Sequence, residues 1–463
     1  MVNINKSETL KKITNGQIDK SWKISGVSID TRNIKKGDLF CALKGINNDG
    51  HEYLLDAFNK GARAVLISKE VTKEKKFSYL KVKNVLEALE KIAKHVRSKS
   101  KAKFICITGS VGKTGTKELF RSAFGKIEKI YANEGNLNNH IGVPLSLFRM
   151  PKKTNICVLE LGMNKLGEIK ELTNMCMPDI AIITAIENAH LKGLRTLRKI
   201  AEAKCEILHN LPKNGCCIFN ADTNYSDLIL KKAKNLKLKN IISYGKKETA
   251  DIRLDKISIQ HNKYIVKADI FGKSLIWKMP IIGEHWILNS LSVLGVGCFY
   301  NYDLNKITKG MSNFVIPKGR GNKKKYQFQE SFFTIIDDSY NSNPASLKAA
   351  LLNLSKIKAQ GKKIAILGDM LELGSKSLNL HLKIKNIIVE SEIDILFTTG
   401  NYMEELAKTI PFNIKKIHFK NIECIFKKFK EIISDQDLVL VKGSNGNNLY
   451  TLIKFIDKEY KAV

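Results

Sequence analysis

Short apolar runs alternate with amphipathic stretches over most of this chain, and the pattern begins abruptly at Phe104. Each run ends in a turn containing glycine, asparagine or aspartate, and a stretch with helical periodicity follows. Apolar runs of this kind are typical of parallel strands buried on both faces, with helices as connections. The runs after residue 104 include FICIT, NICVLELG, IAIITAI and GCCIFNAD. They predict a doubly wound parallel sheet.

The same alternation resumes after residue 318, where the basic, glycine-containing segment IPKGRGNKKK reads as a linker or hinge. The strands expected beyond it are FFTIIDD, KKIAILGDM, ILFTTG and DLVLVKGS, each followed by a helical run. The first hundred residues carry shorter apolar runs, LFCAL and RAVLISK, and end in a charged helical stretch. We therefore predict an α/β protein of three domains: a small α/β domain over 1–100, a central doubly wound domain over 101–317 and a Rossmann-like domain over 318–463.

The 463 residues include no apolar run near the roughly 18 needed to span a bilayer. The first twenty residues are polar and charged, unlike a secretory signal. The nine cysteines form no C-x-x-C pair, and most lie in apolar strand-like runs. Free buried thiols fit a reducing compartment, so we expect a cytoplasmic protein without membrane insertion.

The formal net charge of +33 raises the question of a nucleic-acid partner. Of the 78 basic residues, however, 69 are lysine and nine are arginine, and they are spread along the whole chain. Recognition of bases and phosphates favours the forked guanidinium of arginine. We expect no nucleic-acid partner, but a positive field that attracts anionic substrates.

The segment ITGSVGKTGTKE, residues 107–118, lies between an expected buried strand and a helix. Gly109 and Gly112 would let the backbone curl so that its N–H groups face phosphate oxygens at the positive end of the helix dipole. Lys113 would neutralise the outer phosphates, and Thr114 would ligate Mg²⁺. The spacing G-x-x-G-K-T is two residues shorter than the usual P-loop, and an ordinary glycine turn is the alternative. The strand–loop–helix context favours ATP, with these binding residues: Gly109, Ser110, Val111, Gly112, Lys113, Thr114 and Gly115.

Two further strands end in residues with candidate chemistry. Glu160 follows the apolar run VLE, and a carboxylate at the carboxyl end of a parallel strand faces the ligand crevice, where it can bind Mg²⁺. A local salt bridge is the alternative for this glutamate. His190 follows the next strand, where a ligand role competes with a structural one. Lys204, on a helix fourteen residues later, reads on its own as a solvated surface lysine.

Together these features resemble the Mur amide ligases over nearly the whole chain. The matching segments, in chain order, are 24–45 with DGH at 49–51, the loop at 107–118, GNLNNHIGVPLSL at 135–147, LELGMN at 159–164, AHLKGL at 189–194 with AKCEI at 203–207, GEHWILNSL at 283–291, IDDSYNSNP at 336–344, LGDMLELG at 367–374 and VKGS at 441–444. Within the family, DDSYNSNP and GDMLELG resemble the member that adds D-alanyl-D-alanine to a UDP-N-acetylmuramoyl-tripeptide. The resemblance thus implies an ATP-dependent ligase with these two substrates and Mg²⁺, and we expect it to act as a monomer.

The resemblance also implies roles for individual residues. Lys204 matches a lysine that is carbamylated by CO₂ in much of the family and then helps to hold a second Mg²⁺. With Lys113 and His190 it makes the expected catalytic set, and the expected metal ligands are Thr114, Glu160, His190 and carbamylated Lys204. The remaining nucleotide contacts implied by the resemblance are His285 and Asn289, the hinge arginine Arg320, and Asp338, Tyr340 and Asn341 of the third domain. Ser28 and Arg32 match the residues that bind the uridine diphosphate carrier.

Three positions depart from the family pattern: His140, Trp286 and Asn445 stand where an acidic residue, asparagine and arginine are usual. The rival interpretations are another ligase of this superfamily, either the tripeptide-forming member or a folylpolyglutamate synthase-like enzyme, and a basic ATPase acting on nucleic acid. The last would require clustered arginines and stacking aromatics along a groove, which the sequence lacks.

Overall fold

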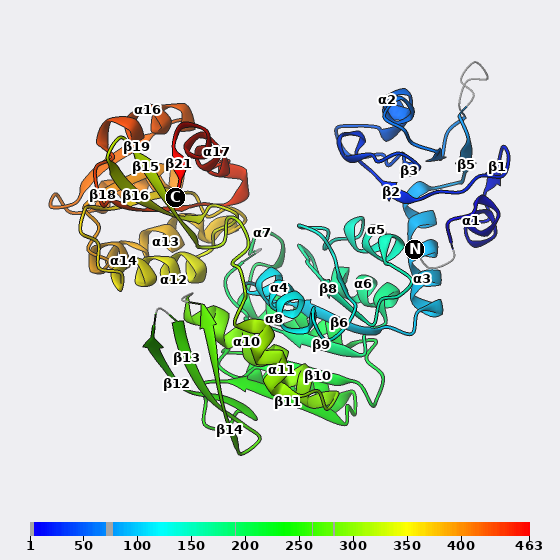
Figure 1. The fold of residues 1–463 in the computed structure, drawn as a ribbon, viewed down its shortest axis with the longest axis horizontal. Helices are drawn as coiled ribbons and strands as arrows, with labels where there is room; N and C mark the ends of the chain where they lie inside the picture. Colours follow the sequence, from blue (N-terminus) through cyan, green and yellow to red (C-terminus); the bar gives the residue numbers. More distant parts are fainter. Residues whose placement is uncertain (1–3, 71–76, 190, 262, 281–282) are drawn as a thin grey trace.

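A computed structural model describes residues 4–70, 77–189, 191–261, 263–280 and 283–463. Its strands form three separate sheets of five, nine and seven strands. In Figure 1 the N-terminal part (blue) and the C-terminal part (yellow to red) lie on either side of the central part. The expectation of an α/β chain built on parallel-dominated sheets is confirmed.

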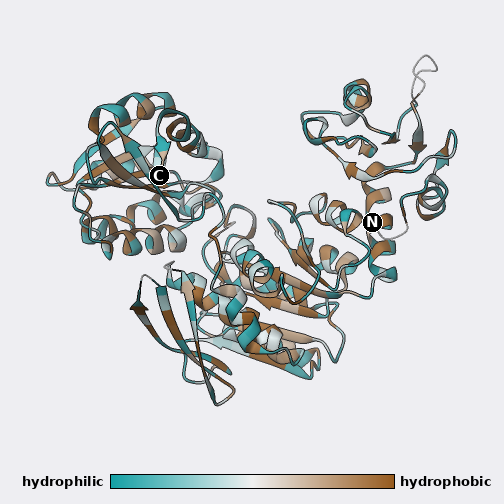
Figure 2. Cartoon of the chain, in the orientation of Figure 1, coloured by the Kyte–Doolittle hydropathy of each residue, from teal (hydrophilic) through white to brown (hydrophobic). Residues whose placement is uncertain are grey.

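The central sheet has the strand order β14-β13-β12-β11-β10-β9-β6-β8-β7. Its parallel strands are β6 (Lys103–Thr108), β7 (Ile130–Ala132), β8 (Ile156–Glu160), β9 (Ile180–Ile183), β10 (Cys216–Asn220) and β11 (Asn240–Gly245). Alternate residues of β6 enter two different apolar cores, with Phe104 and Cys106 in one and Ile105 and Ile107 in the other. The sheet is thus buried on both faces, and the apolar interiors of its strands stand out in Figure 2.

Helices cover both faces of this sheet: α4 (Lys113–Phe124), α5 (Gly142–Arg149), α6 (Glu168–Cys176), α7 (Leu191–Leu194), α8 (Leu197–Cys205), α9 (Ser226–Asn235), α10 (Glu284–Phe299) and α11 (Leu304–Met311), with the short 3₁₀ helix η3 (Glu206–Leu208). Helix α10 is apolar on nearly every side because it is buried between α4, α11 and the sheet.

An extension of the central sheet beyond β11 was absent from the sequence prediction. It consists of β12 (Ile252–Gln260), which pairs in parallel with β11, and of β13 (Lys263–Ile270) and β14 (Lys273–Pro280), which add antiparallel pairs. These strands alternate buried and exposed residues, as in a sheet with one solvated face.

The N-terminal sheet has the order β1-β5-β4-β3-β2, and only β1 runs antiparallel to its neighbour. Its strands are β1 (Gln17–Ile18), β2 (Gly26–Ser28), β3 (Asp38–Cys41), β4 (Ala64–Ile67) and β5 (Tyr79–Lys81), and its helices are α1 (Ser7–Thr14), α2 (Leu54–Asn59), α3 (Val85–Lys99), η1 (Thr31–Asn33) and η2 (Gly50–Tyr53). Helix α3 begins where the Asn84 side chain accepts hydrogen bonds from Leu86 N and Glu87 N. It then packs against α5 and α6, which joins this sheet to the central one.

The C-terminal sheet has the order β19-β18-β17-β20-β16-β15-β21. Its strands are β15 (Asn322–Phe328), β16 (Ser331–Asp338), β17 (Lys363–Gly368), β18 (Ile395–Thr399), β19 (Lys415–Phe419), β20 (Leu438–Lys442) and β21 (Lys461–Ala462). Its helices are α12 (Pro344–Ser355), α13 (Ser377–Leu382), α14 (Lys385–Glu390), α15 (Asn401–Thr409), α16 (Ile422–Ile432), α17 (Tyr450–Glu459), η4 (Gly374–Lys376) and η5 (Asn445–Asn447). Strand β15 pairs antiparallel with both β16 and β21, and the other pairings are parallel. Over the part of the chain that the structure describes, no helix combines the length and apolarity needed to cross a membrane.

Candidate active site

The loop from Gly109 to Gly112 connects β6 to the first turn of α4. Gly112 has φ of 90°, and a Cβ at this position would lie 3.0 Å from the Asn289 amide, so the loop needs glycine for both reasons. The loop is tied to the segment after β9, because Ser110 N donates to Ala185 O (2.7 Å) and the Thr184 hydroxyl donates to Val111 O (2.6 Å). The amino end of α4 is therefore held in place beside β9.

Lys113, the first residue of α4, folds back over this loop. Its ammonium donates to Gly109 O at 2.7 Å. Desolvation by the surrounding protein lowers the pKa of Lys113, the Glu160 carboxylate opposes that shift, and the Arg320 charge adds to it. Lys113, Glu160 and Arg320 are thus close enough to act on one another electrostatically.

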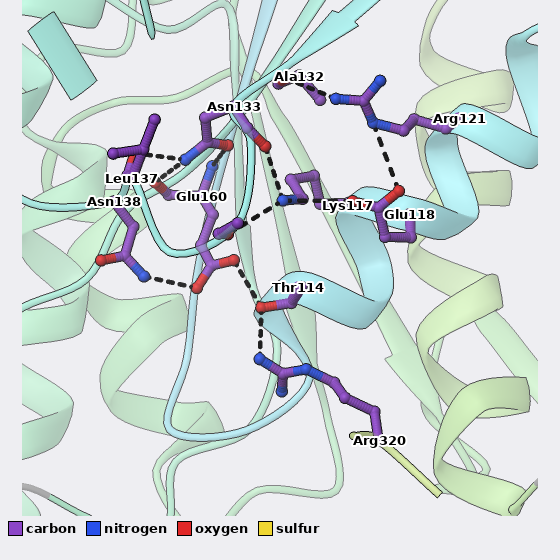
Figure 3. A network of polar contacts seen from close by, with 11 residues as sticks. Thr114, Lys117, Glu118, Arg121, Ala132, Asn133, Leu137, Asn138, Glu160 and Arg320 are labelled. Carbon is purple, nitrogen blue, oxygen red and sulfur yellow. Dashed lines mark hydrogen bonds and ion pairs between the residues drawn. The ribbon is translucent and has the colours of Figure 1, made fainter. Parts of the chain in front are cut away.

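Glu160, the last residue of β8, is 3% exposed, and its carboxylate points toward the first turn of α4 (Figure 3). Its Oε2 accepts from the Thr114 hydroxyl at 2.7 Å, and its Oε1 accepts from Asn138 Nδ2 at 2.8 Å. The strand end, the first turn of α4 and the loop that carries Asn138 therefore meet at one carboxylate.

Arg320 reaches this pair from the segment that leads into the C-terminal sheet. Its Nη2 donates to the Thr114 hydroxyl oxygen at 2.9 Å, and its guanidinium stacks over the Tyr340 ring, 4.1 Å from the centroid. The two flanking glycines, Gly319 and Gly321, have φ of 74° and 91°, which glycine adopts readily. The guanidinium thus bridges the central and C-terminal parts of the chain.

Lys204 lies on α8 and is 1% exposed, although a lone lysine on a helix suggested a solvated side chain. Burial lowers its pKa well below the ordinary value, and the Lys113 charge adds to the shift. Its ammonium has no hydrogen bond or ion pair with another described residue. Burial of this kind favours the neutral amine form of Lys204 over the ammonium. His190, predicted to be a metal ligand together with Lys204, falls outside the described residues.

A cavity of about 1460 Å³ brings most of the predicted nucleotide-binding residues together. From the central part it is lined by Ser110, Val111, Gly112, Lys113, Thr114, Gly115, Glu160, His285 and Asn289, and from the C-terminal part by Arg320, Asp338, Tyr340 and Asn341. Asp338 is paired with Lys442, whose ammonium donates to Asp338 Oδ2 at 2.7 Å and to Asn341 O at 3.0 Å. Desolvation raises the pKa of Asp338, and the Lys442 charge opposes the shift.

Known proteins match this chain over nearly its whole length. Three family models match successive parts of the chain: the Mur ligase family catalytic domain over 23–97, the Mur ligase middle domain over 107–297 and the Mur ligase glutamate ligase domain over 325–445. The chain is 37% identical to the UDP-N-acetylmuramoyl-tripeptide–D-alanyl-D-alanine ligase of Rickettsia prowazekii, covering 97% of this chain and 99% of the relative. It is 32% identical to the enzyme of the same name from Bacillus subtilis, covering 93% of each.

This chain belongs to the Mur ligase family. The crystal structure of MurF from Acinetobacter baumannii superimposes on this Mur ligase with a TM-score of 0.84 and 26% identity, over 98% of both chains. The family expected from the sequence motifs is therefore confirmed.

The two residues predicted to bind the uridine diphosphate carrier lie apart from the cavity, in the N-terminal part of this Mur ligase. The buried Ser28 hydroxyl donates to Asp30 O (2.9 Å) and accepts from Asp30 N (3.2 Å). Arg32 is exposed and pairs with the Asp30 carboxylate at 2.6 Å, which holds the pKa of that carboxyl below its usual range. Ser28 and Arg32 thus flank Asp30, to which the sequence interpretation gave no role.

Other residues at the site also had no predicted role. Asn138 belongs to the segment 135–147, and Lys442 belongs to VKGS at 441–444. Both segments match the family, but no function was predicted for either residue. Both residues line the cavity together with Ser342 and Ser444. Asparagines at the carboxyl edge of a parallel sheet were the signal that could have identified Asn138.

The three departures from the family pattern lie at or beside the cavity. Trp286 is buried and packs on Phe314, with ring centroids 5.1 Å apart, and a Cβ on Gly115 would approach its ring to 2.5 Å. The indole therefore fixes α10 against the first turn of α4. His140 and Asn445 are exposed and line the cavity.

Proposed function

We propose that this Mur ligase joins the amino group of D-alanyl-D-alanine to the terminal carboxylate of UDP-N-acetylmuramoyl-tripeptide, with hydrolysis of ATP to ADP and phosphate. The product is the pentapeptide precursor of peptidoglycan. The observation that carries the proposal is the meeting of Lys113, the Thr114–Glu160 pair and Arg320 at the amino end of α4, in a cavity shared by two parts of the chain. The names of the full-length relatives supply the substrates.

The triphosphate of ATP is the ligand that this end of the cavity fits. The backbone N–H groups of the loop and the positive end of the α4 dipole attract phosphate oxygens. Lys113 and Arg320 add two cationic side chains whose charges can follow the transferring phosphoryl group. By the resemblance, His285 and Asn289 would contact the nucleotide, with Asn289 at adenine. Asp338, Tyr340 and Asn341 would contact ribose and adenine.

Mg²⁺ fits the donor set at the Thr114–Glu160 pair, since both residues present oxygen atoms, which this ion prefers. A bound Mg²⁺ would neutralise charge on the phosphates, and the remaining ligands would be phosphate and water oxygens. His190 enters this ligand set through the resemblance of residues 189–194 alone.

Lys204 is proposed to carry a carbamate that helps to hold a second Mg²⁺. A neutral amine adds to CO₂ by forming an N–C bond and releasing a proton, and the product is an anion. Burial without a paired carboxylate among the described residues favours the neutral amine that this addition needs. The Lys113 charge acts on the pKa of Lys204, which supports a carbamate whose negative charge lies near the proposed phosphate site.

The chemistry follows from the poor reactivity of a carboxylate. Transfer of the γ-phosphoryl group from ATP forms a new O–P bond on the tripeptide carboxylate, breaks the bond to ADP, and gives an acyl phosphate. The amine of D-alanyl-D-alanine then attacks the carbonyl carbon, and phosphate leaves with the bonding electrons. The chain contributes orientation, charge neutralisation and exclusion of water from the acyl phosphate.

We also propose how the three parts divide the work. Residues 1–100 would hold the UDP carrier through Ser28 and Arg32, residues 101–317 would bind ATP, and residues 318–463 would bring the dipeptide and close over the nucleotide. Closure would hinge at residues 318–322, where Gly319 and Gly321 flank Arg320. The enzyme would act as a cytoplasmic monomer, in which one chain supplies all three sites.

Release of phosphate from ATP tests this proposal. Release should require both UDP-N-acetylmuramoyl-tripeptide and D-alanyl-D-alanine, and mass spectrometry should find the UDP-linked pentapeptide. Turnover with a single amino acid in place of the dipeptide, or stimulation by DNA or RNA, would contradict it.

A further inference from the structure

Lys117 is a buried lysine of α4 that lies one turn beyond Thr114 and faces away from the cavity. It is 1% exposed. An ammonium group taken out of water destabilises the fold unless several acceptors surround it. Its partners therefore indicate why a lysine rather than an apolar residue is found at this position.

The acceptors of the Lys117 ammonium lie mainly on the loop that follows β7. Its Nζ donates to Asn133 O at 2.7 Å and to Gly135 O at 3.4 Å, and it lies 3.3 Å from Glu118 Oε1 (Figure 3). Two backbone carbonyls of one short loop are thus tied to the helix that carries Thr114.

Asn133 connects this loop to the end of β8. Its Oδ1 accepts from Glu160 N at 2.9 Å, while its Nδ2 donates to Glu160 O at 3.2 Å and to Leu137 O at 2.8 Å. Asn133 has no solvent exposure, so these bonds are not exchanged with water. The backbone of Glu160 is thereby fixed to the loop that Lys117 holds.

The Glu160 side chain is fixed by the same two elements. Asn138, further along the loop, donates to Oε1, and Thr114, on the helix, donates to Oε2. The separation of Thr114 from Glu160 therefore depends on how the loop is held against α4. Lys117 joins these two elements directly, through its bonds to Asn133 O and Gly135 O.

We infer that Lys117 is a positioning residue for the cation site formed by Thr114 and Glu160. Lys117 touches neither of these side chains by a hydrogen bond or ion pair, and it acts by holding the loop of Asn133 and Asn138 at a fixed distance from α4. This inference rests on the proposed function insofar as the pair binds the cation that accompanies ATP.

The test is Mn²⁺ affinity, measured by electron paramagnetic resonance in the presence of a non-hydrolysable ATP analogue, in Lys117→Met. Methionine has a similar length and no charge, so the loop should lose its tie to α4. Loss of a partner that orients a metal ligand typically weakens metal affinity by about 10–100-fold, and we expect a change in that range.

Arg121→Met is the matched control. Arg121 lies one turn further along α4, also pairs with Glu118 (3.4 Å), and donates to Ala132 O at 2.6 Å, but it has no bond to Asn133, Asn138 or Glu160. Its Mn²⁺ affinity should stay within about twofold of the wild type, even if both variants unfold at lower temperature. Equal weakening in both variants, or wild-type affinity in Lys117→Met, would overturn the inference.

Lys117→Gln covers the case in which the methionine variant does not fold. Its amide can still donate to Asn133 O, so Mn²⁺ affinity should fall by less than expected for methionine but by more than in Arg121→Met. Affinity in this variant equal to that of Arg121→Met would refute the positioning role. Since Mn²⁺ binding needs neither the UDP-tripeptide nor the dipeptide, failure of the proposed ligase activity would be seen separately, in the phosphate-release assay.

Discussion

The Thr114 hydroxyl donates a hydrogen bond of 2.7 Å to Glu160 Oε2 and thereby joins the first turn of α4 to the carboxyl end of β8. The two residues are 46 positions apart, and the parallel pairing of β6 with β8 brings them together. Arg320 donates to the same hydroxyl oxygen from the C-terminal part of the chain. The Thr114 hydroxyl thus connects the first turn of α4, the Glu160 carboxylate and the segment proposed as the hinge.

Replacement of Arg320 by lysine should raise the KM for ATP about tenfold or more. Lysine keeps the charge but loses the flat guanidinium that stacks on Tyr340 and donates to Thr114. One charge-assisted hydrogen bond is worth about 1.5–3 kcal/mol, which is roughly tenfold or more in affinity. Steady-state kinetics measure the effect. Arg253→Lys is the control, because the Arg253 guanidinium pairs with Asp255 within β12. Equal KM values for the two variants would refute a phosphate-facing role for Arg320.

Replacement of Lys204 by alanine should reduce kcat at least about 100-fold, since a preorganised charge at the reacting phosphates would be lost. Short carboxylic acids such as acetate should restore part of the activity by supplying the missing anion. Lys199→Ala, an exposed lysine of the same helix, is the control and should retain wild-type kcat. Full activity of Lys204→Ala without added acid would show that no carbamate is needed.

Binding of both nucleotides should make the molecule more compact. The cavity is lined from both the central and the C-terminal parts, so a ligand that contacts both sides favours closure about residues 318–322. Small-angle X-ray scattering should show a smaller radius of gyration with UDP-N-acetylmuramoyl-tripeptide and a non-hydrolysable ATP analogue together. An unchanged radius would contradict a hinge at this segment.

Asp49, which caps η2 in the N-terminal part, should make the stability of the fold depend on pH in the acid range. The Lys69 ammonium, followed by the His51 backbone N–H, lowers the pKa of this carboxyl. A lowered carboxyl pKa stabilises the fold above the ordinary value near 3.9, and the contribution is lost as pH falls through the folded-state pKa. Asp49→Ala should therefore lower the free energy of unfolding by about 1.5–3 kcal/mol at pH 7, with a smaller difference near pH 2. Urea denaturation at several pH values measures this, and a constant difference would contradict the assignment.

Much of the fold could be predicted because buried parallel strands are nearly continuous apolar runs. The runs NICVLELG, IAIITAI and GCCIFNAD contain β8, β9 and β10, and FFTIIDD falls within β16. The antiparallel strands β12 to β14 were missed. Their apolar residues are interrupted by lysines and other polar residues, and no apolar run in them exceeds three residues. The partial alternation in IRLDKISIQ, which forms β12, was the available signal.

The motifs predict individual residues of the candidate site, but they do not predict the contacts between segments that are far apart in the sequence. The motif around Lys113 and the strand end at Glu160 indicate a nucleotide site, yet the bonds of Asn133 and Lys117 depend on how a loop packs against α4. No sequence feature distinguishes Lys117, four residues after Lys113, as a buried lysine, and the burial of its ammonium becomes evident only in three dimensions. The same holds for Lys204, whose burial no local pattern signals.

A crystal structure with Mg²⁺ and a non-hydrolysable ATP analogue tests the central claim most directly. The account predicts a metal ion about 2.0–2.1 Å from Thr114 Oγ1 and from a Glu160 carboxylate oxygen, with Lys113 Nζ within hydrogen-bond distance of a phosphate oxygen. A triphosphate bound elsewhere, or a metal ion held without Thr114 and Glu160, would contradict it.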